Sequence, residues 1–206
     1  MGLLDTLLGR TRPVQPNLDS LFSLPSAAIT LQSAAGLTVS GRAGVCYKPP
    51  TGQGFADMQA EVVTLLDMEG GGELRTDRDA FGYQWVLLSN PDLETLVSQV
   101  HLVNSSLTDA GWGPQLLCSV FGLAPVPDDG PSSGAGFPVP GPGRVLASTA
   151  FLVYLYKRGS FYPFVPDGPQ HRDTAGELKL RSVVAGDLVV EPELDRWFPL
   201  WESPVG

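Results

Sequence analysis

Side chains that carry catalysis or bind metals in other proteins are sparse in this 206-residue sequence. Its two histidines, His101 and His171, stand in unrelated contexts, and neither belongs to an H-E-x-x-H pattern. His101 lies on the flank of a predicted helix and His171 in a predicted loop, where solvated or core-edge imidazoles are the usual finding. No G-x-x-x-x-G-K-[ST] pattern is present to hold a phosphate. The sequence therefore predicts no catalytic residues, no metal site and no cofactor.

Acidic residues are abundant, but they do not form an evident pair. Asp128 and Asp129 lie in a segment rich in Pro and Gly, and Asp167, Asp173 and Glu177 are scattered among residues typical of turns. Solvated surface charge is the default interpretation of all five. Two carboxylates brought together by the fold could still act as general acid and base, so a hydrolase stays open as the least favoured alternative.

The two cysteines, Cys46 and Cys118, show no C-x-x-C spacing, and each lies in an apolar run, GVCYK and LLCSV. Such runs are typical of buried strands. Because unpaired cysteine commonly behaves as a small hydrophobic residue in a core, we expect both to be structural thiols.

Large aromatic side chains gather near the end of the sequence, in EPELDRWFPLW at 191–201. Trp197, Phe198 and Trp201 either clamp this segment onto the core or form an exposed anchor of the kind found in protein interfaces. Trp112, between a predicted helix and a predicted strand, raises the same choice. The core interpretation is favoured for the chain end, and all four rings are kept as candidates for partner binding.

Four leucines near the N-terminus, Leu3, Leu4, Leu7 and Leu8, form one apolar face of a short amphipathic helix predicted within residues 1–12. A helix of this length is not stable alone, so it must dock on the body of the protein, on a partner or on lipid. We expect the leucine face to contact a partner.

The acidic composition narrows the classes of partner. A formal net charge of -9 repels nucleic-acid phosphates and gives no general attraction to anionic lipid. No apolar run reaches the roughly 18 residues that span a bilayer, and the N-terminus does not have the pattern of a signal peptide. We expect a cytoplasmic protein with a protein partner, no nucleic acid and at most peripheral membrane contact.

The most apolar stretch of the sequence, FLVYLYKRGSFYPFVP at 151–166, predicts a β-hairpin in the middle of a sheet. Gly159 can take the positive φ that a tight turn needs, and Pro163 places the returning strand at a bulge or at an edge of the sheet. Two alternating sets of apolar side chains predict a first strand covered on both faces. They are Phe151, Val153 and Leu155 on one side and Leu152, Tyr154 and Tyr156 on the other.

The remaining pattern predicts an α+β fold. Helical spacing of apolar residues predicts helices over 17–24, 26–36, 57–68 and 93–107. A β-prone composition predicts strands over 41–48, 73–76, 83–88, 115–123, 177–184 and 187–190. Pro and Gly dominate 125–143, which we expect to be a mobile loop between neighbouring strands, with a domain linker as the alternative. We expect a single domain, 1–206, in which amphipathic helices cover a mixed or mainly antiparallel sheet.

Four phrases of the sequence resemble the PspAB family of PspA-associated proteins, which belongs to the actinobacterial phage-shock envelope stress response. They are MGLLDTLLGR at the start, NSSLTDAGWGPQLLCSVFG at 104–122, LVYLYKRGSFYPFVP at 152–166 and LDRWFPLW at 194–201. The resemblance covers nearly the whole chain except 125–143. It implies a cytoplasmic accessory protein whose gene often neighbours one for an HtpX-like membrane zinc metalloprotease. It implies no catalytic residues.

Three functions compete at this stage. The leading hypothesis is a non-enzymatic adaptor of the phage-shock response that binds a membrane-associated partner, either a PspA-like protein or an HtpX-like metalloprotease. The second is a chaperone-like protein that binds client segments on an aromatic surface made of Trp112, Tyr154, Tyr156, Phe161 and Tyr162. The third is the hydrolase with an unrecognised acidic site.

Overall fold

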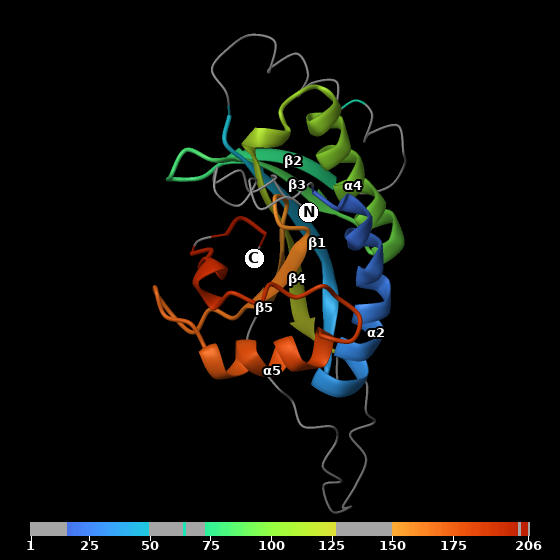
Figure 1. Ribbon diagram of the computed structural model, residues 1–206, viewed down its shortest axis with the longest axis vertical. Helices are drawn as coiled ribbons and strands as arrows, with labels where there is room; N and C mark the ends of the chain where they lie inside the picture. Colours follow the sequence, from blue (N-terminus) through green and yellow to red (C-terminus); the bar gives the residue numbers. More distant parts are fainter. Residues whose placement is uncertain (1–15, 50–63, 65–72, 127–149, 202, 206) are drawn as a thin grey trace, which may run out of the picture.

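The computed structural model describes residues 16–49, 64, 73–126, 150–201 and 203–205 (Figure 1). The predicted N-terminal helix with Leu3, Leu4, Leu7 and Leu8 lies outside the described residues. So do the predicted helix at 57–68, apart from Thr64, and nearly all of 125–143.

A six-stranded sheet in the order β2-β3-β1-β4-β5-β6 forms the centre of the molecule. Every pair of neighbouring strands in it is antiparallel, so the predicted α+β class is confirmed. The strands are β1 (Leu37–Tyr47), β2 (Glu73–Arg78), β3 (Gln84–Ser89), β4 (Leu116–Pro125), β5 (Ala150–Leu155) and β6 (Ser160–Phe164). β4 and β5 flank the segment rich in Pro and Gly, and they pair directly from Cys118↔Leu155 to Leu123↔Ala150.

Three α-helices and three short 3-10 helices complete the described fold. The α-helices are α2 (Leu24–Ala35), α4 (Leu93–Asp109) and α5 (Thr174–Val184), and the 3-10 helices are η1 (Leu18–Ser23), η2 (Gly113–Gln115) and η3 (Leu194–Arg196). Asp92 caps α4 by accepting a hydrogen bond from the backbone N–H of Thr95, as its position before an apolar helical pattern predicts. Gly36 ends α2 with a φ of 66°, a left-handed conformation that glycine adopts without strain.

The β5–β6 hairpin has the two-sided burial predicted for it. Leu152 and Tyr154 pack in the core cluster on the helix side of the sheet, whereas Phe151 and Val153 pack in a second cluster on the other side. Gly159 makes the turn with a φ of 63°. β6, which contains Pro163, is an edge strand, and this agrees with the inability of proline to donate a ladder hydrogen bond.

Residues 174–184 form the helix α5, so the strand predicted over 177–184 is wrong. Glu177, Leu180 and Val184 are spaced by three and four residues and are all buried, which is the pattern of one helix face. Asp173 begins the helix by accepting a hydrogen bond from Gly176 N at 2.9 Å. The strand predicted at 187–190 is also wrong, because only an isolated bridge joins Val190 to Phe161.

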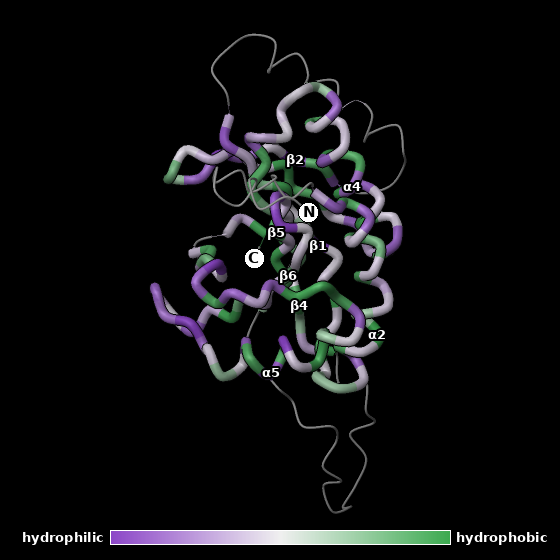
Figure 2. The backbone as a smooth tube through the Cα atoms, in the orientation of Figure 1, coloured by the Kyte–Doolittle hydropathy of each residue, from purple (hydrophilic) through white to green (hydrophobic). Residues whose placement is uncertain are grey.

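The two faces of the sheet are covered by different kinds of structure. α2 and α4 lie along one face, with α5 packed against α2, and the C-terminal segment crosses the other (Figure 1). Hydrophobic segments run through the strands between these layers (Figure 2). We call the cluster under the C-terminal segment the pocket-side cluster; it contains Cys46, Trp85, Leu87, Cys118, Val120, Phe151, Val153, Tyr162, Phe164, Trp197 and Val205.

Candidate binding pocket

Residues 189–201 and 203–205, which we call the C-terminal strap, are held on the pocket side of the sheet, although η3 is the only helix or strand among these described residues. The backbone of the strap pairs with the edge strand β6: Phe161 N donates to Val189 O, and Glu191 N donates to Phe161 O, both at 2.8 Å. Trp197, which is 4% exposed, stacks on Tyr162 with the ring centroids 5.9 Å apart. The indole N–H of Trp197 donates to Glu191 O at 3.1 Å.

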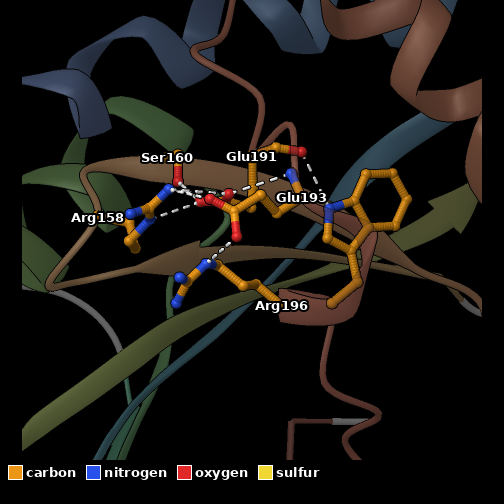
Figure 3. A network of polar contacts seen from close by, with 6 residues as sticks. Arg158, Ser160, Glu191, Glu193 and Arg196 are labelled. Atoms are coloured by element: carbon orange, nitrogen blue, oxygen red, sulfur yellow. Dashed lines mark hydrogen bonds and ion pairs between the residues drawn. The ribbon is translucent and has the colours of Figure 1, made fainter.

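A buried carboxylate, Glu191, fixes the beginning of the strap (Figure 3). Arg158 donates to its two oxygens at 3.0 and 3.2 Å, and Ser160 Oγ donates to it at 2.8 Å. Burial opposes the charged form of Glu191, but the hydrogen bonds from Arg158, Ser160 and Glu193 N outweigh it, so the pKa of Glu191 is lowered. The carboxylate is therefore ionised at neutral pH and joins the strap to the turn between β5 and β6.

A second buried carboxylate, Glu177 on α5, fixes the strap further along. Arg172 Nε donates to its oxygens at 2.9 and 3.0 Å, and Val165 N donates to it at 3.1 Å. The same guanidinium donates from Nη1 to Trp197 O at 2.8 Å. Both buried carboxylates thus have a charged partner, as burial of an ionised group requires. Arg158 joins Glu191 of the strap to the β5–β6 turn, and Arg172 joins Glu177 to the backbone of the strap at Trp197.

The strap leaves part of the pocket-side face open, and a cavity of about 550 Å³ lies there. This volume is in the range of small-ligand and anchor-residue pockets in proteins. Its walls come from β1, β3, β4 and β6, from the end of β5, from the β2–β3 and β5–β6 turns and from the strap. The residues that line it are Cys46, Asp79, Phe81, Tyr83, Trp85, Leu117, Cys118, Leu155, Lys157, Arg158, Tyr162, Arg196, Phe198, Pro199, Leu200, Trp201 and Ser203.

Two exposed phenylalanines mark the rim of this pocket. Phe81 in the β2–β3 turn is 73% exposed, and Phe198 on the strap is 58% exposed. Exposed aromatic rings beside an apolar cavity are typical of interaction surfaces. Sequence reasoning missed Phe81, and the available signal was its position between the strands predicted at 73–76 and 83–88.

Asp79 holds the β2–β3 turn in shape. Its Oδ1 accepts hydrogen bonds from Phe81 N at 3.0 Å and from Tyr83 N at 2.9 Å, and its Oδ2 accepts one from the indole N–H of Trp85 at 3.0 Å. Gly82 takes a φ of 85° within this turn. The carboxylate is therefore engaged in positioning the pocket wall, and no second Asp or Glu is among the described residues that line the pocket.

The structure separates the aromatic candidates predicted from the sequence. Phe198 and Trp201 line the pocket, whereas the neighbouring Trp197 of the strap is buried in the pocket-side cluster. Trp112 packs against the cluster on the helix side of the sheet. The predicted client surface is not formed, because four of its five aromatic side chains are buried. Tyr154, Tyr156 and Phe161 lie in the core on the helix side, and Tyr162 lies in the pocket-side cluster.

Cys46 and Cys118 are buried, as predicted, but they are also direct cross-strand partners on β1 and β4. Neither forms a disulfide, and both line the pocket. The hydrogen bond with Cys118, followed by burial and by the negative charge of Asp79, raises the pKa of the Cys46 thiol well above its ordinary value. Sequence spacing could not reveal this pair, because only the sheet register brings the two residues together.

The histidines do not approach the pocket. His101 packs its ring on Phe22 with the centroids 5.0 Å apart, and His171 lies 3.5 Å from Asp167 in an exposed turn. Within the described part of the chain, no group of three or more His, Cys, Asp or Glu side chains could hold a metal ion. The same residues include no helix long and apolar enough to cross a bilayer.

The sheet has helices on one face and the strap-bordered pocket on the other, and the described residues thus form a single α+β domain with a preformed apolar pocket. The chain belongs to the family of PspA associated protein B, whose family model matches residues 1–205. Comparisons with curated proteins and with solved structures gave no match. The resemblance found from the sequence phrases is therefore confirmed at the level of the family.

Proposed function

We propose that this chain is a non-enzymatic accessory protein that binds an apolar segment of a PspA-like protein in the pocket beside the strap. The observation that carries the proposal is the cavity of about 550 Å³ with the exposed rings of Phe81 and Phe198 at its rim. Burial of large aromatic side chains supplies much of the binding energy in protein interfaces. The family name, which associates these proteins with PspA, supports the choice of partner.

The charges that line the pocket support a protein segment as its occupant. Lys157 lines the pocket in a protein whose net charge is -9, so an apolar segment with an acidic neighbour would be attracted locally while most of the surface repels anions. Arg158 and Arg196 also line the pocket, but they pair with Glu191 and Glu193 of the strap.

The non-enzymatic assignment is supported by the carboxylates of the pocket lining. A hydrolase of the kind considered above needs two carboxylates that act as general acid and base. Asp79 is the one carboxylate among the described lining residues, and its oxygens hold Phe81, Tyr83 and Trp85 in place. We place the action of the protein in the cytoplasm, with any contact to the membrane made through its partner.

A binding titration of the full chain with the PspA-like protein of the same organism tests the proposal. Replacing both rim residues, Phe81→Ser and Phe198→Ser, removes two exposed anchors and should weaken the complex about tenfold or more. Ile29→Ser is the matched control, because Ile29 is 72% exposed on α2 in the helix layer. The control should bind as the wild type does.

The outcomes of this titration separate the alternatives. Equal binding by the rim variant and the wild type would contradict a pocket-centred contact, and the leucine face of Leu3, Leu4, Leu7 and Leu8 would then be tested by serine replacement. Equal affinity for unrelated amphipathic peptides would favour a chaperone-like binder. Binding of an HtpX-like metalloprotease in place of the PspA-like protein would change the partner but keep the site.

A further inference from the structure

The paired cysteines line the same pocket, but the partner contacts proposed above are assigned to the aromatic rings at its rim. Cys46 and Cys118 come from adjacent strands at the centre of the sheet, directly opposite in register. Both side chains belong to the pocket-side cluster and line the cavity. Two sulfur atoms therefore converge at one place that a small ligand can reach, held by the backbone ladder of the sheet.

The register favours a shared ligand over a disulfide. Side chains directly opposite on antiparallel strands have Cβ atoms about 4.5–5.5 Å apart. Disulfides have these atoms about 3.5–4.5 Å apart, so an ordinary cross-strand pair lies at or beyond the upper end of that range. An ion shared by the two sulfur atoms spans a wider separation than an S–S bond does. We propose that Cys46 and Cys118 bind one soft, thiophilic cation of the Cu(I) class through their two sulfur atoms.

The donor set selects the class of ion. Thiolate sulfur prefers soft cations such as Cu(I), whereas calcium and magnesium require several oxygen ligands. A structural zinc site requires four N, S or O donors, and the described residues contain no group of three or more candidate ligands. Asp79, the nearby carboxylate, is occupied by the hydrogen bonds that shape the β2–β3 turn. A two-coordinate cation fits these donors, and zinc does not.

The surroundings can balance the charge of such a complex. Each thiol gives up its proton to solvent as its S–H bond is replaced by a bond to the cation, so two thiolates and one Cu(I) ion carry a net charge of -1. No electron is transferred. The carboxylate of Asp79 in the same cavity opposes this negative charge, and Lys157 supplies a positive charge that offsets it. The walls include apolar groups from Trp85 and Leu117, which limit the access of water to the ion.

Competition for Cu(I) between the reduced full-length chain and a chromogenic Cu(I) chelator, without oxygen, tests the proposal. The wild type should bind one ion per chain. Cys46→Ser and Cys118→Ser should each weaken binding by more than about 100-fold, because losing a ligand exceeds the effect of losing an outer contact. Zinc, titrated in parallel as the control ion, should not bind with comparable affinity.

X-ray absorption at the copper edge of the wild type gives a readout that does not depend on how well the serine variants fold. Two sulfur neighbours are expected. Three results would overturn the proposal. The copper could have nitrogen or oxygen neighbours in place of sulfur, or either serine variant could bind the ion with wild-type affinity. The reduced protein could also bind no ion and form a Cys46–Cys118 disulfide on oxidation. None of these results measures the affinity for a PspA-like protein, which the Phe81→Ser and Phe198→Ser variant reports, so the two proposals fail separately.

Discussion

At the scale of single residues, the packing of the strap on the sheet depends on Gly44, a position where the strap comes too close to the strand for a side chain to fit. Gly44 on β1 lies beneath the end of the strap, and a Cβ atom there would be 2.7 Å from Val205 Cγ2 and 3.1 Å from the side chains of Leu87 and Trp85. The absence of a side chain at this position is what allows Val205 to be buried against the sheet.

Gly44→Ala should therefore destabilise the protein by about 1–3 kcal/mol, the usual cost of overpacking a core. Urea unfolding followed by tryptophan fluorescence measures it. Gly186→Ala is the matched control, because a Cβ at Gly186 would meet nothing within 4 Å, and it should change the free energy of unfolding by less than about 0.5 kcal/mol. Val205→Ala added to Gly44→Ala should recover part of the loss, and equal stabilities for the two alanine variants would contradict this packing.

Glu191 offers a second test at the residue scale. Glu191→Gln removes a buried charge that pairs with the partly exposed Arg158, and it should cost about 2–4 kcal/mol of unfolding free energy, because Ser160 Oγ and Glu193 N lose a charged acceptor inside the protein. Glu193→Gln breaks ion pairs of the same arginine and of Arg196 at an exposed position and should cost less than about 1 kcal/mol. Similar losses for the two glutamine variants would show that the strap does not depend on the buried pair.

At the scale of elements, the strap has two kinds of aromatic residue next to each other. Trp197 stacks on Tyr162 and is buried, and Phe198 beside it is exposed at the pocket rim. Alternating burial along an irregular segment lets the strap close the core with one residue and face a partner with the next. The sequence left open whether these rings belong to the core or to an interface. Trp197 belongs to the core, and Phe198 next to it is exposed at the pocket rim.

Trp197→Ala should lower the free energy of unfolding by about 3–5 kcal/mol, as removal of a buried large aromatic side chain does. Phe198→Ala should change it by less than about 1 kcal/mol and should instead weaken the complex with a PspA-like protein. Parallel unfolding and binding titrations measure both effects. If Phe198→Ala lowered the free energy of unfolding as much as Trp197→Ala does, the assignment of Trp197 to the core and Phe198 to the interface would be contradicted.

The attachment of the strap should weaken in acid. The folded-state pKa of Glu191 lies below its ordinary value of 4.5, so its contribution to stability is fully present above that value and is lost as pH falls through the lowered pKa. Between about pH 5 and about pH 3, the wild type should lose more unfolding free energy than Glu191→Gln, which has no carboxylate to protonate there. Urea unfolding at several pH values measures the difference, and parallel pH profiles for the two proteins would refute this linkage.

At the scale of the whole molecule, the sequence predicts the helix-covered sheet better than it predicts the pocket. The β5–β6 hairpin is readable because both of its faces are apolar, and α4 because its apolar residues keep helical spacing up to a capped start. α5 was misread because Leu178 and Leu180 alternate with Lys179 and Arg181 as in a strand, and because Val183 and Val184 are β-branched. The Asp173 cap and the burial of Glu177, Leu180 and Val184 on one face show the helix.

The pocket itself could not be predicted, because its walls come from segments that are far apart in the sequence. The β2–β3 turn, the start of β4 and the strap meet only once the sheet order is known. The Cys46–Cys118 pair depends further on the register of β1 against β4, which shifts between Val39 and Ala43 and between Cys46 and Tyr47. No local pattern encodes such shifts.

Backbone hydrogen exchange of the full chain, free and in complex with a PspA-like protein, tests the central proposal most directly. If the pocket is the contact site, protection on binding should increase in the β2–β3 turn at 79–83 and in the strap at 196–203, the segments that carry Phe81 and Phe198 at the rim. Protection confined to α2 and α4, on the opposite face of the sheet, with none in those two segments, would contradict it.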